Sequence, residues 1–296
     1  MDSGLAPAKV NLTLHVTGQR ADGYHLLDSL VVFAGIGDQV SVASSDYLGL
    51  TVSGPFSQGV PVDEGNLVLR AARALQAARG VARGAAIRLT KNLPHAAGIG
   101  GGSSDAAATL RLLADLWGVA PLSPQDPAVL GLGADVPACL TAPEPVRMRG
   151  VGERLNALHP LPPVALVLVN PRVTVPTGPV FAALTAKDNP GMDALPQGLD
   201  FDGFCHWLAR QRNDLLAPAM TAAPQVALAL RRLRALPQVG FATMSGSGAT
   251  CVALCRDMGA ARNAARAVQV AEQNWWVAPA EMLAPEPVVQ AMRATT

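Results

Sequence analysis

A glycine-rich segment is the part of this chain whose residue types and spacing most directly indicate chemistry. Residues 94–105 read Pro-His-Ala-Ala-Gly-Ile-Gly-Gly-Gly-Ser-Ser-Asp, and a run of good helix formers follows as far as Trp117. Glycine is used where the backbone takes positive φ or approaches another group closely, and Ser103 or Ser104 is expected to cap the helix. Free N–H groups at a helix N-terminus bind anions. The segment therefore predicts a phosphate-binding loop.

Two common kinds of phosphate loop do not fit this segment. A Walker loop needs a Gly-Lys pair, and the chain contains none. A dinucleotide-binding fingerprint needs glycine where Ser103 stands, and it follows a strand directly, whereas residues 91–94 intervene here. The remaining alternative is a glycine-rich surface turn before an ordinary helix.

The composition is typical of a globular enzyme. With 296 residues and 50% hydrophobic content, the chain can bury a large core and is expected to form about two domains. A net charge of +1 without a basic block argues against a nucleic-acid partner. No apolar run approaches the ~20 residues of a membrane span, and the first residues lack signal-peptide features. Four scattered cysteines favour reduced thiols in a cytoplasmic protein.

The chain has only three lysines, Lys9, Lys91 and Lys187, against twenty arginines. Arginine cannot always replace a compact ammonium whose pKa can be tuned, so a retained lysine is a candidate for chemistry. The alternative is a compositional bias toward arginine that left a few lysines by chance, and this alternative explains Lys187 well enough. Residues 8–16 alternate strictly between apolar and polar types, which predicts a half-buried strand. Its polar face carries Lys9, and its solvent-exposed part would hold Thr13 and His15.

The glycine loop resembles the ATP loop of the GHMP kinase superfamily, Pro-x-x-x-Gly-Leu-Gly-x-x-Ser-Ser, with Ile99 in place of leucine. The resemblance implies a two-domain α+β fold with the active site in the interdomain cleft. It implies that ATP is bound, with Mg²⁺ expected, although no carboxylate cluster marks a metal site. His95 would flank the nucleotide or be a solvated loop residue. The residues implied to bind ATP are Asn66, Pro94, His95, Ala96, Ala97, Gly98, Ile99, Gly100, Gly101, Gly102, Ser103 and Ser104.

Two further segments narrow the resemblance. Residues 7–12 (Pro-Ala-Lys-Val-Asn-Leu) and 20–25 (Arg-Ala-Asp-Gly-Tyr-His) are similar to the opening of one GHMP kinase family. Its members phosphorylate the 2-hydroxyl of 4-diphosphocytidyl-2-C-methyl-D-erythritol, in the non-mevalonate route to isoprenoid precursors. Further matches follow in order at 65–68, 131–137, 150–153, 176–181, 213–215 and 245–249. The resemblance implies a small-molecule acceptor, a cytidine-diphosphate-linked sugar alcohol, and the charge and the short apolar runs argue against a nucleic-acid or membrane partner.

The resemblance also implies a catalytic pair. Asp135 would accept the alcohol proton, while Lys9 would hold Asp135 ionised and stabilise charge on the transferred phosphoryl group. From the residues alone, Asp135 is a turn or cap residue in a sharp loop before Pro137. Phosphoryl transfer is largely a matter of positioning, so the extent of proton transfer at the transition state stays open.

The acceptor end of the site is implied in the same way. Tyr24 and Phe181 would form the walls of a cytosine slot, and His25 would bond the edge of the base. Phe181 also fits core packing, because apolar residues surround it. Asn11 would bind the sugar-alcohol or phosphate end. The second glycine loop would approach the substrate phosphates with Gly246 and Ser247, although Ser-Gly repeats are equally typical of a hairpin turn.

The division into domains is expected near Pro143-Glu144-Pro145, giving residues 1–147 and 148–296. Residues 188–198 are expected to form a flexible excursion. Two rival functions remain: another GHMP kinase, acting on mevalonate or homoserine, and a catalytically silent nucleotide-binding protein, against which Lys9 and Asp135 argue. Strands are expected at 8–16, 29–34, 39–44, 48–53, 86–90, 164–169, 239–244, 249–255 and 274–278, and helices at 66–79, 103–117, 127–133, 203–217, 223–235 and 258–272.

Overall fold

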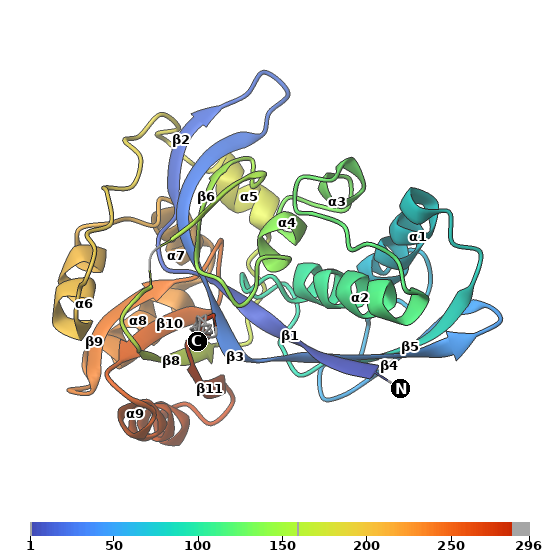
Figure 1. The fold of residues 1–296 in the computed structure, drawn as a ribbon. Coiled ribbons are helices and arrows are strands. Elements are labelled where there is room, and N and C mark those ends of the chain that lie inside the picture. The colour runs from blue at the N-terminus through green and yellow to red at the C-terminus, as the bar shows by residue number, and fades with distance from the viewer. Residues whose placement is uncertain (1, 159, 286–296) are drawn as a thin grey trace, which may run out of the picture.

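The structure, a computed structural model, describes residues 2–158 and 160–285. Two sheets with helices packed on them make up the described chain (Figure 1), which confirms the predicted α+β class. The first sheet contains β1 (Asp2–Asn11), β2 (His15–Gln19), β3 (His25–Ser45), β4 (Leu48–Ser53), β5 (Gly84–Thr90), β6 (Val146–Gly150) and β7 (Arg154–Ala157). The second sheet contains β8 (Ala165–Asn170), β9 (Val239–Met244), β10 (Cys251–Cys255) and β11 (Trp276–Glu281).

Strand β3 is the central strand of the first sheet, in which the strand order is β4-β5-β3-β6-β7 and β1 and β2 also pair with β3. It is 21 residues long and pairs antiparallel with β1, β2, β5 and β6. Only β4 and β5 run parallel in this sheet, as far as the structure describes it. The second sheet has the order β11-β8-β10-β9 and is antiparallel.

The helices cover the two sheets separately. Helices α1 and α2 pack against each other and against the first sheet (Figure 1), and Leu75 and Leu113 join Val40 and Ile87 in one buried cluster. The helices are α1 (Leu67–Arg79), α2 (Gly101–Trp117), α3 (Pro127–Leu130), α4 (Val136–Cys139), α5 (Thr177–Ala182), α6 (Phe201–Ala209), α7 (Leu216–Ala222), α8 (Pro224–Arg234) and α9 (Met258–Ala271).

Strand β8 is buried on both faces, as its continuous apolar run predicts. Val167 and Val169 share a core cluster with residues of α8 and α9. Leu166 and Leu168 point the other way, into a cluster that contains Val10 of β1. The two sheets therefore contribute to a common apolar cluster, and β1 lies at the junction between them.

The structure corrects the predicted strand at residues 8–16. The strand is interrupted: β1 ends at Asn11, Leu14 pairs with Asn213 in an isolated bridge, and β2 resumes the pairing with β3 at His15. Thr13 and His15 are buried, not exposed. Their polar atoms are satisfied by long-range contacts, such as the one from His15 Nδ1 to the carbonyl oxygen of Pro190 at 3.3 Å.

Other predicted boundaries also change. The strands expected at 29–34 and 39–44 are one strand, β3, and the helix expected at 203–217 is two helices, α6 and α7. The helix breaks because the backbone at 212–214 pairs with Leu14. Strands β6 and β7 and helices α4 and α5 were not predicted, and β6 extends the first sheet past residue 147.

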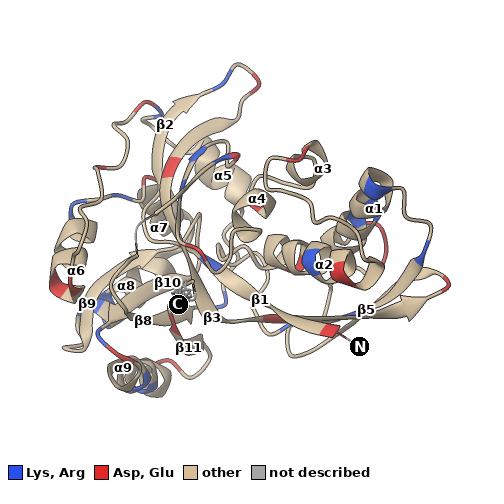
Figure 2. Cartoon of the chain, viewed as in Figure 1, with Lys and Arg blue, Asp and Glu red and all other residues tan. Residues whose placement is uncertain are grey.

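Charged side chains of both signs are scattered over the two lobes (Figure 2). No helix in the described ranges is long and apolar enough to cross a bilayer.

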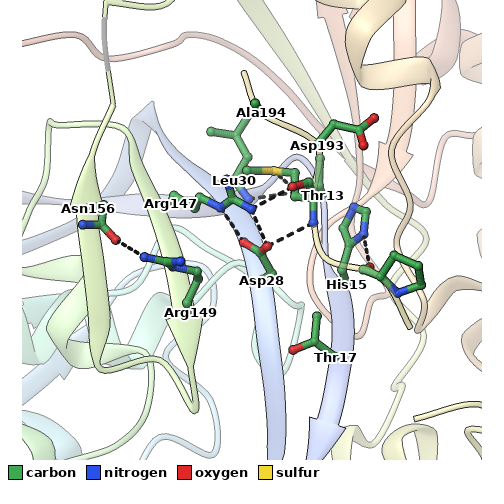
Figure 3. A network of polar contacts seen from close by, with 12 residues as sticks. Thr13, His15, Thr17, Asp28, Leu30, Arg147, Arg149, Asn156, Asp193 and Ala194 are labelled. Carbon is green, nitrogen blue, oxygen red and sulfur yellow. Dashed lines mark hydrogen bonds and ion pairs between the residues drawn. The ribbon is translucent and has the colours of Figure 1, made fainter. Parts of the chain in front are cut away.

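A partly buried ion pair holds the irregular segment 188–198 against the first sheet (Figure 3). The guanidinium of Arg147 donates to both carboxylate oxygens of Asp28, at 2.8 and 2.6 Å, and to the carbonyl oxygen of Met192 at 2.7 Å. Asp28 in turn accepts a hydrogen bond from the amide of Met192 at 3.0 Å. The predicted excursion is thus irregular but anchored by charge-assisted hydrogen bonds, and the side chain of Met192 is buried.

Replacing Arg147 with alanine should therefore destabilise the fold. Asp28 would keep its charge in a buried position without its partner, which should lower the free energy of unfolding by about 2 kcal/mol. The matched control is Arg149→Ala on the same strand, since Arg149 is exposed and donates only to Asn156. That variant should stay within about 0.5 kcal/mol of the parent. Urea unfolding midpoints measure both, and equal shifts for the two variants would contradict the anchoring role.

Candidate active site

The glycine loop is hydrogen-bonded to the free edge of β1. The amide of Lys9 donates to the carbonyl oxygen of Ile99 at 3.0 Å, and the Ser104 hydroxyl donates to the carbonyl oxygen of Pro7 at 2.6 Å. The register of β1 against β3 shifts between Pro7 and Ala8, at the same place. These contacts fix the loop beside Lys9.

Helix α2 begins earlier than the capping serines predict. Gly100 occupies the N-cap position with a φ of 61°, and the helix starts at Gly101. The prediction that Ser103 or Ser104 caps the helix is therefore wrong, because the left-handed conformation of Gly100 already turns the chain into the helix. A Cβ atom at Gly102 would meet nothing within 4 Å. Two glycines thus begin the first turn, and Gly102 leaves open space beside it, which suits the binding of an anion by the free N–H groups of a helix N-terminus.

Lys9 and Asp135 form an ion pair at the end of this loop. Lys9 Nζ lies 2.7 Å from Asp135 Oδ1, although the two residues are 126 positions apart. The Lys9 side chain is only 4% exposed, whereas that of Asp135 is 41% exposed. Asp135 sits at the N-cap position of α4 but makes no side-chain capping bond there. Its carboxylate is therefore free to serve both the buried ammonium and an incoming ligand.

The second glycine loop touches the first. The Ser245 hydroxyl accepts a hydrogen bond from the amide of Asn11 at 3.0 Å and donates to the carbonyl oxygen of Gly98 at 2.8 Å. A Cβ atom at Gly98 would lie 2.4 Å from the carbonyl oxygen of Ser245, so only glycine allows this approach. The loop also joins β9 to β10, which makes it a hairpin connection as well as part of the site. The Ser247 hydroxyl lies 2.9 Å from that of Thr177 in α5.

Aromatic rings gather at the far end of the site. The ring centroids of His25 and Phe181 are 4.8 Å apart with an interplanar angle of 30°. Burial, and then the charge of Lys187, lower the pKa of His25, so its ring is neutral at pH 7. Its buried Nε2 atom has no hydrogen-bond partner in the described structure. Tyr24, which precedes His25 in the chain, lines the same cavity and is 61% exposed.

One cavity of about 1190 Å³ connects these groups. All three lysines line it, Lys187 included. Of the predicted site residues, Ile99 and Ser104 are buried behind the loop and do not line it. The predicted residues that do line it are Lys9, Asn11, Tyr24, His25, Asn66, Pro94, His95, Ala96, Ala97, Gly98, Gly100, Gly101, Gly102, Ser103, Asp135, Phe181, Gly246 and Ser247. Asn66 also caps α1, accepting a hydrogen bond from the amide of Val68 at 2.9 Å.

Comparison with known proteins assigns the chain to a protein family. The family model for the GHMP kinases N terminal domain matches residues 66–142, and that for the GHMP kinases C terminal domain matches residues 194–272. A 4-diphosphocytidyl-2-C-methyl-D-erythritol kinase of Jannaschia sp. (strain CCS1) is 54% identical over 280 residues, covering 95% of this chain and 97% of the relative. The chain belongs to the family of 4-diphosphocytidyl-2-C-methyl-D-erythritol kinases.

Solved structures agree with membership of this GHMP kinase family. A crystal structure of 4-(cytidine 5'-diphospho)-2C-methyl-D-erythritol kinase superposes with a TM-score of 0.77 at 36% identity, covering 96% of this chain and all of that chain. A homoserine kinase from Cytophaga hutchinsonii superposes with a TM-score of 0.64 at 20% identity, covering 95% of both chains, and shares the fold alone. The chain is therefore a GHMP kinase with a two-domain α+β fold, and it uses ATP.

Three charged residues beside the kinase site were not predicted as site residues. Lys91 contacts Asp38, and its Nζ lies 2.6 Å from Oδ2 of Asp105, all beneath the glycine loop. The scarcity of lysine marked Lys91, and Asp105 follows the loop serines directly, but no sequence signal pointed to Asp38. Strand pairing between β3 and β5 brings Asp38 close to Lys91 from 53 positions away.

The open space at Gly102 allows a direct test of the phosphate cradle. Gly102→Ala adds one methyl group that meets no protein atom, so the fold should survive while the methyl occupies the space for phosphate. The dissociation constant for ATP should rise at least about tenfold, a loss of about 1.4 kcal/mol. The control is Gly49→Ala in β4, because Gly49 lies outside the cavity and a Cβ atom there would make only ordinary contact, at 3.5 Å, with the side chain of Tyr47. Calorimetric titration with ATP measures both, and equal affinities for the two variants would contradict the assignment.

Proposed function

We propose that this enzyme transfers the γ-phosphoryl group of ATP to the 2-hydroxyl of 4-diphosphocytidyl-2-C-methyl-D-erythritol. One observation carries the proposal: a single cavity is lined by the glycine loop, by the Lys9–Asp135 pair and by the ring pair of His25 and Phe181. These are a nucleotide-phosphate cradle, a proton acceptor with its cation, and an aromatic surface for a base. The full-length similarity to relatives of that name supports the same substrate.

The chemistry of the transfer falls to Lys9 and Asp135. Asp135 accepts the proton of the acceptor hydroxyl, because its carboxylate is partly open to the cavity. Lys9 orients the carboxylate of Asp135 through a contact of 2.7 Å and stabilises negative charge on the transferring phosphoryl oxygens. The N-terminus of α2 binds the remaining phosphate charge through its free amides. Since phosphoryl transfer has a loose transition state, the chief contribution of these groups is positioning and electrostatics.

The acceptor is proposed to bind at the aromatic end of the cavity. Phe181 and Tyr24 offer flat surfaces to cytosine, and the unpartnered Nε2 of neutral His25 offers a hydrogen bond to its edge. Asn11 has a buried Oδ1 atom without a partner, and this atom is suited to a hydroxyl of the sugar alcohol. Gly246 and Ser247 are proposed to contact the substrate phosphates.

Magnesium is proposed to enter with the nucleotide. The described residues contain no group of three or more His, Cys, Asp or Glu side chains that could hold a metal. Mg²⁺ often relies on substrate phosphates and water for most of its ligands, which suits this cavity. Its chemistry, when bound, is to neutralise phosphate charge.

Other features of the enzyme are proposed from its composition. We infer a cytoplasmic enzyme with small-molecule substrates and without a nucleic-acid or membrane partner. The division of the chain into residues 1–147 and 148–296 stays a prediction; the two family models lie on either side of it.

The substrate assignment is tested by comparing acceptors. ADP release should be fast with 4-diphosphocytidyl-2-C-methyl-D-erythritol and much slower with the same alcohol lacking its cytidine diphosphate. Homoserine and mevalonate should not support turnover. If removal of the cytidine group leaves kcat/KM unchanged, the cavity does not recognise cytosine, and the enzyme is a GHMP kinase for a different alcohol.

The two tyrosines of the chain give a matched pair of variants for the cytosine slot. Tyr24→Ala should weaken binding of the cytidine substrate by about 5–150-fold, since a base-stacking surface is worth roughly 1–3 kcal/mol. Binding of ATP should not change. Tyr47→Ala is the control, because Tyr47 is 75% exposed and lies outside the cavity. Titration with the cytidine substrate measures both variants, and an unchanged affinity for Tyr24→Ala removes this residue from the slot.

A further inference from the structure

A buried cluster of three charged side chains lies beneath the glycine loop, and the proposed transfer does not use it. The ammonium of Lys91, after β5, contacts Asp38 of β3 and lies 2.6 Å from Oδ2 of Asp105 in α2. All three residues are buried, and Asp105 is only 3% exposed. A Cβ atom at Gly101 would lie 3.6 Å from both Lys91 Nζ and Asp38 Oδ2. The cluster therefore forms the floor of the loop.

The hydrogen bonds of the cluster are unevenly shared. Asp38 is saturated, because its Oδ1 accepts from the amides of Asn92 and Leu93, at 2.5 and 2.9 Å, while its Oδ2 accepts from Lys91. Asp105 accepts from Lys91 through Oδ2, but its buried Oδ1 has no partner in the described structure. Two carboxylates share one ammonium, so one negative charge is in excess. Asp105 is the member with room for a proton.

Among the described residues, no other charged side chain forms an ion pair or hydrogen bond with the cluster. Lys9 of β1 faces Asp135, and Arg111 of α2 donates to the carbonyl oxygen of Cys139 at 3.3 Å. Burial raises the pKa of Asp105 to about 7; Lys91 opposes this rise and Asp38 adds to it. Burial lowers the pKa of Lys91, but Asp105 and Asp38 more than offset this, so the lysine remains charged.

The geometry of the cluster points to a coupling between nucleotide and proton, which rests on the proposed binding of ATP by the loop. We propose that Asp105 is a positioning residue that takes up a proton when the phosphates of ATP bind above it. The polyphosphate brings negative charge to the turn directly over the cluster. The uncompensated negative charge of Asp105 then becomes less favourable, and protonation of its carboxylate is favoured. The proton comes from solvent and adds to the carboxyl group of Asp105, and no other bond forms or breaks.

The coupling has a definite sign. Because the ATP-bound enzyme holds more protons than the free enzyme, the dissociation constant for ATP must rise as the pH rises through the pKa of Asp105 in the free enzyme. When Asp105 is protonated, the positive charge of Lys91 has only one negative charge to neutralise, that of Asp38. The floor of the loop then carries no net charge against the phosphates.

Calorimetry of ATP binding with saturating Mg²⁺ tests this coupling. Titrations near pH 7.5, in two buffers with different heats of ionisation, count the protons taken up. The wild type should take up about half a proton more than Asp105→Asn, which keeps an acceptor for Lys91 but cannot titrate there. Relative to that variant, the dissociation constant of the wild type should rise about fivefold between roughly pH 6.5 and 8.5. Asp115→Asn, an exposed position on α2, is the control and should match the wild type.

Equal proton uptake by wild type and Asp105→Asn, with ATP binding intact, would overturn the proposal. A purely structural role would weaken ATP binding equally at every pH and leave the proton count unchanged. If Asp105→Asn does not fold, proton uptake by the wild type at two pH values tests the proposal. Its uptake near pH 7.5 must disappear near pH 5.5, where Asp105 is protonated in both states, and uptake that persists there overturns the proposal. Failure of the wild type to bind ATP at all would instead contradict the proposed function.

Discussion

The ion pair between Lys9 and Asp135 is the contact on which the arrangement of the site depends. The ammonium of Lys9 is almost fully buried, so without the carboxylate it would be an uncompensated charge in the junction of the two lobes. Asp135 is partly open, and it serves the ammonium on one side and the cavity on the other. The same contact thus compensates the charge of the buried lysine and holds the partly open carboxylate at the cavity.

The backbone around this pair fixes the two ends of the cavity relative to it. The amide of Lys9 donates a hydrogen bond to the carbonyl oxygen of Ile99 in the first glycine loop. The amide of Asn11 donates one to the Ser245 hydroxyl in the second glycine loop. Ser245 then bonds back to Gly98. Strand β1 therefore carries Lys9, the proposed catalytic lysine, and joins both loops. Effective transfer needs donor and acceptor groups held at a set distance, and these short contacts supply that constraint.

Local patterns in the sequence predicted the glycine loop and the strand that carries Lys9. A glycine-rich phosphate loop and an alternation of apolar and polar residues can both be recognised from neighbouring residues. Asp135 entered only through family resemblance, since a turn aspartate has no distinctive local pattern. Asp38 was missed because strand pairing alone brings it to Lys91. Long-range pairing likewise merged two expected strands into β3 and broke one expected helix at residues 212–214. The start of α2 was misplaced because the serines looked like caps, whereas Gly100 makes the turn.

The claim that Lys9 and Asp135 act as one unit is most directly tested by a double-mutant cycle. Single-turnover rates would be measured for the wild type, Lys9→Met, Asp135→Asn and the double variant, each saturated with both substrates. Each single change should slow transfer by about 10²–10⁴-fold, and the double variant should be no slower than the slower single variant, within a few-fold. Losses that multiply in the double variant would show two independent residues and contradict the account.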